Sequence, residues 1–282
     1  MTPDHPQAQP FLKWAGGKGQ LLAQYEAFFP STPMRRYFEP FVGSGAVFFY
    51  LRAKGRFERY YLSEINVELV NCYRVARDDV EGLIRLLAAH RECHSADYYY
   101  AVRALDRDPG WCYAADAARA ARMIYLNKTC YNGLWRVNSQ GYFNVPMGRY
   151  KTPDILNADR LRAASAALQG VELSMMDFEG VIRLAGPGDF VYLDPPYFPL
   201  TKTAYFTSYA ADSFGEYEHR KLALVFAELD RLGARVMLSN SDTLLVREIY
   251  RDFRTETVLA RRAINSATGK RGVITEIVVM NY

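Results

Sequence analysis

The four residues Asp194-Pro195-Pro196-Tyr197 constrain the fold of this chain more than any other part of its sequence. They directly follow the apolar run Phe190-Val191-Tyr192-Leu193, which is typical of a buried strand. Because proline cannot continue a hydrogen-bonded ladder, the strand must stop here, and the turn after it must be stiff. A carboxylate, unpaired carbonyls and an aromatic ring are therefore expected at the carboxyl end of one strand, where open α/β sheets bind ligands. An ordinary strand end with a solvated Asp194 remains the alternative.

A glycine-containing turn follows another apolar strand nearer the N-terminus. The run Tyr37–Phe41 leads into Gly43-Ser44-Gly45, and Ala46–Leu51 favours a helix. Such a turn brings backbone and a helix N-terminus close to a ligand, but the third glycine of a dinucleotide fingerprint is missing. A second strand, Tyr60–Glu64, ends 21 residues after Gly43, about where an acidic residue binds the ribose of an adenosine cofactor. Glu64 is therefore a candidate ribose ligand, with a surface helix cap as the alternative.

The segment Phe11–Lys18 ends in Gly-Gly-Lys and invites comparison with a phosphate-binding loop. That comparison fails, because Leu12 and Gly19 stand where the loop needs Gly and Ser or Thr. What remains is a glycine-rich turn with Trp14 and Lys18. It suits an aromatic surface against a base or a cation, or an ordinary surface turn.

The third informative segment runs from Asn127 to Lys151. Ser139-Gln140-Gly141 favours a hairpin turn between two arms that interleave Lys, Arg and Asn with Tyr, Trp and Phe. Arg and Asn read base edges, Lys and Arg neutralise phosphates, and aromatic rings stack on bases. The hairpin therefore indicates nucleic-acid binding, whereas by itself it also fits an ordinary charged surface.

Composition places broad limits on the chain. With 282 residues, half of them hydrophobic, it is long enough for one large α/β domain and a smaller inserted one. No apolar run reaches the length of a membrane span, and the first ten residues do not resemble a signal peptide. The four cysteines lack C-x-x-C spacing and are expected to be reduced thiols, and His90–His94 lacks the spacing of a metal site. A net charge of +4 is weak evidence for a nucleic-acid partner.

With these motifs together, the chain resembles the Dam-type (D12 class, group alpha) DNA adenine-N6 methyltransferases over nearly its whole length. Tyr131-Asn132-Gly133-Leu134 and Phe143-Asn144-Val145-Pro146 carry the resemblance most specifically, and the order of the motifs agrees. The resemblance implies an α/β fold: a Rossmann-like S-adenosylmethionine-dependent methyltransferase sheet with an inserted, mainly helical DNA-recognition domain carrying a β-hairpin. We expect residues 11–70 and 165–282 to form the catalytic domain and 71–164 the recognition domain, with its hairpin near 134–150.

The resemblance also implies roles for individual residues. Asp194 and the Pro195 carbonyl would accept hydrogen bonds from adenine N6, Tyr197 would stack on the extruded base, and S-adenosyl-L-methionine would be the cofactor. The expected cofactor-binding residues are Trp14, Lys18, Phe41, Gly43, Gly45, Glu64, Asp177, Phe178 and Asp194. The expected DNA-binding residues are Lys13, Tyr131, Asn132, Leu134, Arg136, Asn138, Pro146, Arg149 and Tyr150. No metal is expected.

Other expectations follow from the same resemblance. The target would be double-stranded DNA, with GATC as the sequence, and the enzyme would be cytoplasmic, of bacterial or phage type, with no membrane and no obligate protein partner. Glu64 stands where Asp is frequent in relatives, and Met147 where Phe or Tyr is expected. A cytosine-N4 methyltransferase more often has Ser at position 194, and protein-glutamine and many RNA methyltransferases have Asn there. A non-catalytic DNA-binding module is a further alternative, and a role in restriction-modification, mismatch repair or gene regulation stays open.

Overall fold

The computed structural model describes residues 8–198, 214–261 and 273–282. The sequence also predicts loops at Thr201–Phe214 and Asn265–Arg271, and these lie outside the described residues, apart from Phe214. The chain divides into two compact units, and each is considered by itself. Unit 1 comprises Met1–Gly17, Gly43–Lys54 and Glu64–Met175, and unit 2 comprises Lys18–Val42, Gly55–Ser63 and Met176–Tyr282. The expected recognition domain, 71–164, falls entirely in unit 1, and the boundary itself stays a prediction.

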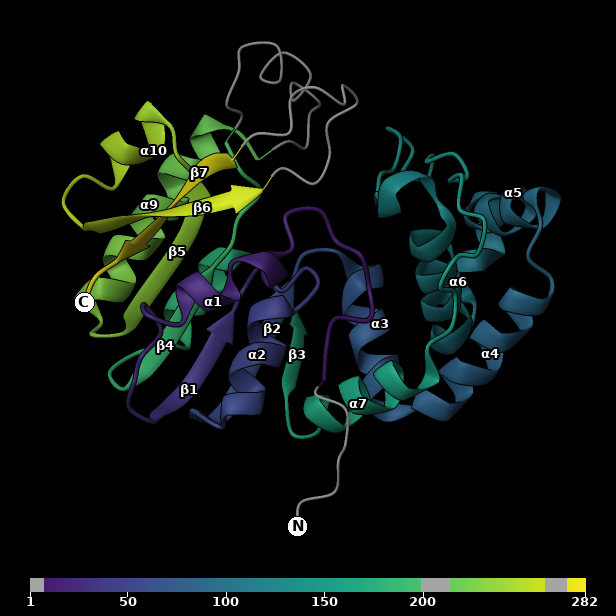
Figure 1. The fold of residues 1–282 in the computed structure, drawn as a ribbon, viewed down its shortest axis with the longest axis horizontal. Helices are drawn as coiled ribbons and strands as arrows, with labels where there is room; N and C mark the ends of the chain where they lie inside the picture. The colour runs from purple at the N-terminus through teal and green to yellow at the C-terminus, as the bar shows by residue number, and fades with distance from the viewer. Residues whose placement is uncertain (1–7, 199–213, 262–272) are drawn as a thin grey trace. The chain divides into compact units, whose positions relative to one another are not determined.

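The described part of unit 2 contains six strands, hydrogen-bonded in the order β2-β1-β4-β5-β7-β6 (Figure 1). The first four run parallel, and β7 is antiparallel to both β5 and β6. The strands are β1 (Met34–Glu39), β2 (Phe57–Glu64, up to Ser63 in this unit), β4 (Asp189–Leu193), β5 (Arg235–Ser241), β6 (Arg254–Arg261) and β7 (Val273–Met280). The strand order reverses between β1 and β4, which is the place where doubly wound sheets bind ligands. The unit therefore has the Rossmann-like α/β architecture expected from the sequence.

Strand β4 shows why this sheet is buried on both faces. Its residues alternate, so that Val191 and Leu193 pack into one apolar cluster with η5 (Phe178–Arg183), α9 (Glu216–Arg231) and α10 (Leu244–Ile249). Phe190 and Tyr192 point the other way, against Phe29 and Tyr25 near α1 (Leu22–Tyr25). A strand covered on both faces reads as a continuous apolar run, as this one does. The carboxyl end of β4 is thereby fixed from two sides.

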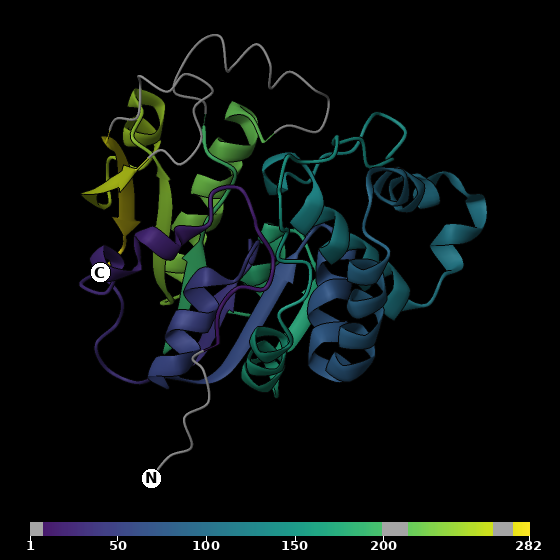
Figure 2. The same cartoon turned by 45° about the vertical axis from the view of Figure 1, so that its right-hand side comes forward.

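Unit 1 is mainly helical. Helix α6 packs against α3, α4 and α5, and these helices lie side by side in both views (Figures 1 and 2). Polar N-cap side chains start four of its helices: Asn66 begins α3, Asp79 α4, Ser95 α5 and Asn157 α7. The elements are α2 (Ala46–Lys54), α3 (Val67–Asp78), α4 (Val80–Glu92), α5 (Ala96–Ala104), η2 (Leu105–Arg107), η3 (Pro109–Tyr113), α6 (Asp116–Thr129), η4 (Tyr131–Gly133), α7 (Ala158–Leu168) and β3 (Glu172–Met175).

The segment after α6 turns back on itself as two antiparallel arms. Val137 pairs with Phe143, and Cys130 with Met147, while the Asn138 carboxamide oxygen accepts the N–H groups of Gln140 and Tyr142 at 3.1 and 3.0 Å. Asn138 is therefore used inside the turn, which closes the hairpin around Ser139-Gln140-Gly141.

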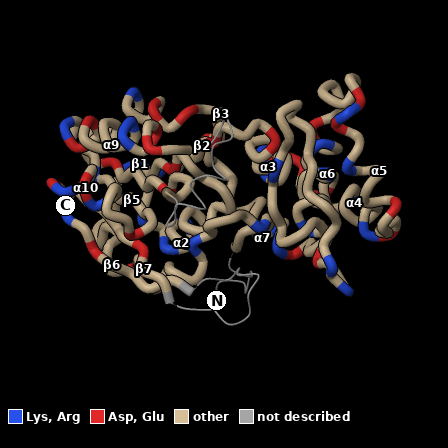
Figure 3. Tube along the Cα trace, turned by 90° about the horizontal axis from the view of Figure 1, so that it is seen from above, with Lys and Arg blue, Asp and Glu red and all other residues tan. Residues whose placement is uncertain are grey.

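The two units show similar mixtures of charged residues, and neither has a described helix that could span a membrane. Lys and Arg are interspersed with Asp and Glu around α4 in unit 1 and around α9 in unit 2 (Figure 3). Within the described part of the chain, no helix is long and apolar enough to cross a membrane.

Candidate functional site

The Asp194 carboxylate lies at the carboxyl end of β4 and is held by two neighbours in unit 2. The Lys18 ammonium, in η1 (Lys18–Gln20), is 2.8 Å from Oδ1, and the Ser239 hydroxyl of β5 donates to the same oxygen at 2.8 Å. Because the Ser239 proton goes to Asp194, Tyr192 donates its own hydroxyl proton to Ser239, 2.9 Å away. Among the residues that the structure describes, both contacts fall on Oδ1, so Oδ2 is available to a ligand.

Burial and charge act against each other on Asp194. Desolvation raises the pKa of this carboxyl, and the Lys18 charge and the Ser239 hydrogen bond lower it. Lys18, only 5% exposed, thus stabilises the ionised form of a carboxylate that is itself 18% exposed. The sequence predicts Lys18 as a cofactor contact, which stays a prediction, and in the structure Lys18 pairs with Asp194.

Tyr197 follows Asp194 and is oriented by its hydroxyl group. That hydroxyl donates to Oε2 of Glu276, on β7, at 2.6 Å, and the Lys18 ammonium lies 4.5 Å from the centre of the ring. Burial raises the pKa of Tyr197 well above its usual value, so the group is a neutral donor. Pro195 is buried and Pro196 exposed, as expected of a stiff turn at the sheet edge. Lys18, Asp194 and Tyr197 are therefore in contact within unit 2.

An aromatic cluster in unit 2 includes two more of the expected cofactor residues. The rings of Phe41 and Phe178 are stacked with centres 5.5 Å apart, and both contact Phe214. Phe178 is buried in the apolar cluster of β4 and α9, and Asp177 before it is exposed. An exposed acid beside a fixed aromatic pair is a chemically suitable binder for a planar nitrogen base.

The glycine turn that opens α2 lies in unit 1. Gly43 and Gly45 have φ values of 47° and 69°, which residues other than glycine rarely adopt. A Cβ on Gly43 would come 2.9 Å from the Trp14 ring, and one on Gly45 would come 2.8 Å from the Tyr73 hydroxyl. That hydroxyl donates to the Gly43 carbonyl at 2.9 Å. Trp14 therefore packs directly on the turn, and the two glycines leave the backbone there without side chains.

Glu64 ends β2 beside this turn, in the same unit. Its Oε1 accepts the N–H of Ile65 at 3.0 Å and that of Asn66 at 3.4 Å. Burial raises the pKa of Glu64, and the backbone donors, including Gly43, lower it. A half-buried carboxylate fixed by backbone fits the hydroxyl groups of a ribose. The glycine turn and the Glu64 carboxylate are therefore groups of the types that bind an adenosine cofactor, and they follow one another along the chain in the expected order.

Lys13, Asn127 and Gly133 form a second polar centre in unit 1. Asn127, at the end of α6, accepts the Lys13 N–H at 2.8 Å and donates to the Lys13 carbonyl at 2.6 Å and the Gly133 carbonyl at 3.0 Å. The Lys13 ammonium lies 4.4 Å above the ring of Tyr150. Two expected DNA-binding residues, Lys13 and Tyr150, are thus in contact, and Asn127 fixes the first.

The remaining expected DNA-binding residues lie along the hairpin. Tyr131 is 48% exposed, and its N–H donates to the Pro146 carbonyl at 2.9 Å. Asn132 is exposed, with a φ of 56° that asparagine tolerates better than most residues. Leu134 is half-buried, whereas Arg136 and Arg149 are exposed. Exposed cations and a half-exposed ring on one hairpin provide contacts of the types that DNA binding uses.

Three of the residues that hold expected site residues in place are absent from the predicted site residues: Asn127, Ser239 and Glu276. Glu276 had a signal, since it is a lone carboxylate in the apolar run Val273–Met280. Asn127 directly follows the apolar run Met123–Leu126, which is also an unusual place for a buried amide. Nothing in the sequence distinguishes Ser239 from other strand serines.

Cysteines and possible metal ligands have no visible role in these contacts. The four cysteines are unpaired, with Cys72 and Cys130 buried and Cys93 and Cys112 exposed. Among residues 8–198, 214–261 and 273–282, no group of three or more His, Cys, Asp or Glu side chains could hold a metal ion.

Comparison with known proteins gives a consistent set of relatives. The model of the family described as D12 class N6 adenine-specific DNA methyltransferase matches residues 14–264. A Type II methyltransferase of Lactococcus lactis subsp. cremoris is 42% identical over 276 residues, covering 97% of this chain and 95% of the relative. One from Methanocaldococcus jannaschii is 42% identical over 290 residues, covering 98% and 100%. The DNA adenine methylase of Haemophilus influenzae is 34% identical over 276 residues, covering 96% and 93%.

Proposed function

Since the chain belongs to the D12 class of N6 adenine-specific DNA methyltransferases, whose reaction is methylation of adenine N6 in DNA, we propose that it acts on GATC in double-stranded DNA and extrudes the target base. The cofactor is S-adenosylmethionine, whose sulfonium supplies an already activated methyl group. The difficult part of the reaction is then the acceptor. The adenine N6 lone pair is delocalised into the ring and is a poor nucleophile.

The observation that carries the proposal is the fixed carboxylate of Asp194. With Oδ1 held by Lys18 and Ser239, Oδ2 would accept a hydrogen bond from the N6 amino group. The Pro195 carbonyl would accept the second N6–H. These two acceptors would turn the nitrogen lone pair out of the ring plane, and the carboxylate charge would stabilise the positive charge that develops on N6. Holding the carboxylate in advance saves reorganisation during the reaction.

The cofactor roles carried over from the family fit the groups found in each unit. Glu64 would bind the ribose hydroxyls, and the bare backbone at Gly43 and Gly45 would bind the methionine part, with Trp14 packed on that turn. Asp177 and the stacked Phe41 and Phe178 would contact the cofactor adenine. In our proposal, Lys18 acts on Asp194 first and contributes to cofactor binding only through it.

The duplex substrate and base extrusion rest on the hairpin. A single-stranded substrate needs only stacking surfaces and a charged groove, and the cations and amides at Lys13, Arg136 and Asn132 exceed that requirement. A paired adenine cannot present N6 to a methyl donor, and enzymes that modify bases remove them from the stack. Tyr131, half exposed, would fill part of the space left in the duplex, and Tyr197 would stack on the extruded base. GATC follows from the likeness of this hairpin to that of GATC-modifying relatives.

The alternatives differ in product. The family is adenine-specific, and Asp194 occupies the position that is more often Ser in cytosine-N4 methyltransferases. A non-catalytic DNA-binding module would not need an ionised carboxylate fixed beside an aromatic ring. The cytoplasmic location expected from the sequence remains part of the proposal.

The test is direct identification of the modified bases. Plasmid DNA from a methylation-deficient host is incubated with the full-length protein and S-adenosylmethionine, and modified positions are mapped on single molecules. We expect N6-methyladenine in GATC, with Asp194→Ala protein as the inactive control. Modification at another sequence would contradict the GATC assignment, and N4-methylcytosine would contradict the acceptor chemistry.

A further inference from the structure

Asn144 holds the side chain of Arg136, the residue expected to read a guanine. The two lie on facing arms of the hairpin, where the Arg136 Nε donates to Oδ1 of Asn144 at 2.7 Å and the Asn144 N–H donates to the Arg136 carbonyl at 3.1 Å. Because the contact uses Nε, the two terminal nitrogens of Arg136 stay together on its far side. Bidentate recognition of guanine O6 and N7 needs such a pair of donors.

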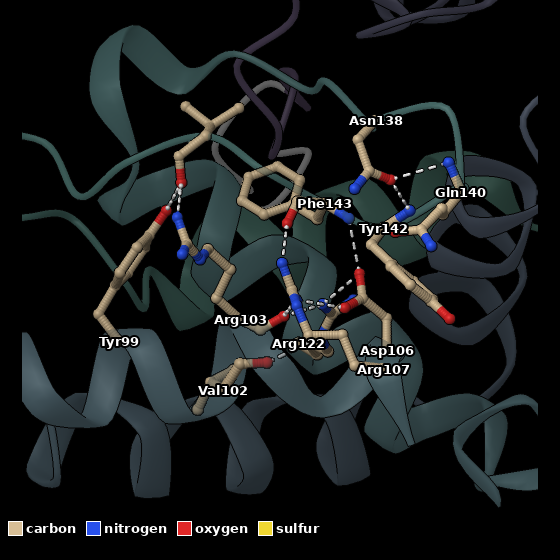
Figure 4. A network of polar contacts seen from close by, with 11 residues as sticks. Tyr99, Val102, Arg103, Asp106, Arg107, Arg122, Asn138, Gln140, Tyr142 and Phe143 are labelled. Atoms are coloured by element: carbon tan, nitrogen blue, oxygen red, sulfur yellow. Dashed lines mark hydrogen bonds and ion pairs between the residues drawn. The ribbon is translucent and has the colours of Figure 1, made fainter. Parts of the chain in front are cut away.

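Asn144 is itself fixed by the residues on either side of it. The Phe143 N–H donates to Oδ2 of Asp106 at 2.7 Å, and its carbonyl accepts from Nη2 of Arg107 at 3.0 Å (Figure 4). One adjacent pair in η2 thus satisfies both backbone groups of Phe143. The ring of Phe143 is fully buried and lies 4.8 Å from that of Trp135.

Val145 is held in the same way from α5. Its carbonyl accepts the Tyr99 hydroxyl at 3.0 Å and Nη1 of Arg103 at 3.3 Å (Figure 4). Since side chains alternate along an extended segment, anchoring residues 143 and 145 directs Asn144 to the opposite side, towards Arg136. The helices therefore determine where this amide is placed.

Asp106 is a charged group with several partners at the base of this arrangement. Besides Phe143, it pairs with Arg107 at 2.7 Å and with Arg122 at 2.8 Å. Arg122 is 5% exposed and also donates to the carbonyls of Val102 and Arg103 at 2.9 and 2.8 Å. Removing one partner of such a buried pair is costly, because the other charge stays buried. The anchor is consequently costly to disrupt.

We propose that Asn144 is a specificity-determining positioning residue, which orients Arg136 for base reading, and that the Asp106–Arg107 pair sets the position of Asn144. The inference rests on the proposed function, since it requires Arg136 to read a base. Neither Asn144 nor Arg107 needs to contact DNA to act in this way. Their loss should therefore lower kcat/KM on the cognate site more than on a site substituted at the base pair that Arg136 reads.

The experiment compares kcat/KM on a GATC duplex with kcat/KM on duplexes carrying one substitution at each base pair. Asn144→Ala and Arg107→Gln should each lower discrimination roughly twofold to tenfold, and only at the base pair affected by Arg136→Ala. Asn144→Asp keeps an acceptor for Nε and should retain discrimination. Arg162→Gln is the charge control, because Arg162 is in the same unit and pairs with Glu81, away from the hairpin.

The double variant Arg136→Ala with Asn144→Ala separates positioning from independent effects. If Asn144 acts through Arg136, its loss adds nothing to discrimination in the double variant. Unchanged discrimination in Asn144→Ala and Arg107→Gln, or an equal loss at every base pair, would overturn the inference while leaving the proposed function intact. Unchanged discrimination in Arg136→Ala would instead overturn base reading by Arg136, and the inference with it.

Discussion

Lys18 and Asp194 form an ion pair at the carboxyl end of β4, with 2.8 Å between Nζ and Oδ1. The two residues come from motifs that are far apart in the sequence, a glycine-rich turn and a proline-stiffened strand end. Both side chains are largely removed from water, and a carboxylate alone in such surroundings would tend to take up a proton. The pair therefore connects the N-terminal motif to the proposed chemistry, since the lysine charge favours the ionised form of the acceptor carboxylate against the effect of burial.

Replacing Lys18 by Met should shift the acidic limb of the pH profile of kcat to higher pH. Burial already raises the pKa of Asp194, and the lysine opposes that effect, so its loss should raise the pKa further. The control is Arg231→Met, which removes the partner of Glu228 at the end of α9 in unit 2. A uniform loss of rate at every pH would contradict this role.

Asp194→Ala should lower kcat by roughly a hundred- to thousandfold, because one preorganised electrostatic group is removed. The variant removes one partner of a largely buried ion pair, so we expect a folded protein of lower thermal stability. Circular dichroism and thermal unfolding check the fold, and single-turnover methylation measures the chemical step. Near-normal turnover would end the proposed mechanism.

The strand that positions Asp194, and helix α9 that packs against that strand, could be predicted because local rules determine them. The run Phe190–Leu193 is continuous and apolar, prolines end it, and it forms β4 (Asp189–Leu193). Helix α9 (Glu216–Arg231) follows the spacing of Leu222, Val225, Phe226 and Leu229, all buried. In each case the pattern repeats within one element, so no knowledge of its neighbours is needed.

Partners could not be predicted, because they depend on which elements become neighbours. Ser239 reaches Asp194 only because β5 pairs with β4, and Glu276 reaches Tyr197 from β7. The pairing of Lys18 with Asp194 likewise depends on where η1 lies against the sheet. Sequence patterns indicate burial and periodicity, whereas contacts between strands follow from the order of the sheet.

Arg136→Ala should cost roughly 1–3 kcal/mol of discrimination at one base pair, if the residue reads a guanine edge. Arg149→Ala, at an exposed cation expected to touch phosphate, should weaken binding to all sequences alike and reduce the salt dependence of binding. Binding constants on cognate and singly substituted duplexes at several salt concentrations distinguish the two. Equal losses on cognate and substituted duplexes would exclude Arg136 from base reading.

His219 should make folding stability depend on pH between about 4 and 6.5. It is fully buried on α9, and burial lowers its pKa to about 4 despite the opposing charge of Glu218. The unfolded chain takes up this proton near pH 6.5. Titration of His219 therefore costs no folding stability above that value. As the pH falls towards 4, folding stability decreases by on the order of 3 kcal/mol at most. Urea unfolding of wild type and His219→Gln at pH 7 and 4.5 measures it, and equal pH dependence in both would contradict the prediction.

Tyr197 offers a test of base extrusion in which the ring and the hydroxyl are removed separately. Tyr197→Phe keeps the stacking surface and loses only the hydrogen bond to Glu276, whereas Tyr197→Ala loses both. If the ring stacks on an extruded adenine, 2-aminopurine at the target position should become more fluorescent when wild-type protein binds. Tyr197→Ala should then impair methylation more than duplex binding, since base–aromatic stacking contributes roughly 1–3 kcal/mol. The methylation rate of Tyr197→Phe should lie between the rates of wild type and Tyr197→Ala. It should lie closer to wild type if Glu276 only orients the ring. Absence of a fluorescence change, together with faster methylation of single strands, would exclude duplex extrusion and leave an adenine methyltransferase with an open substrate.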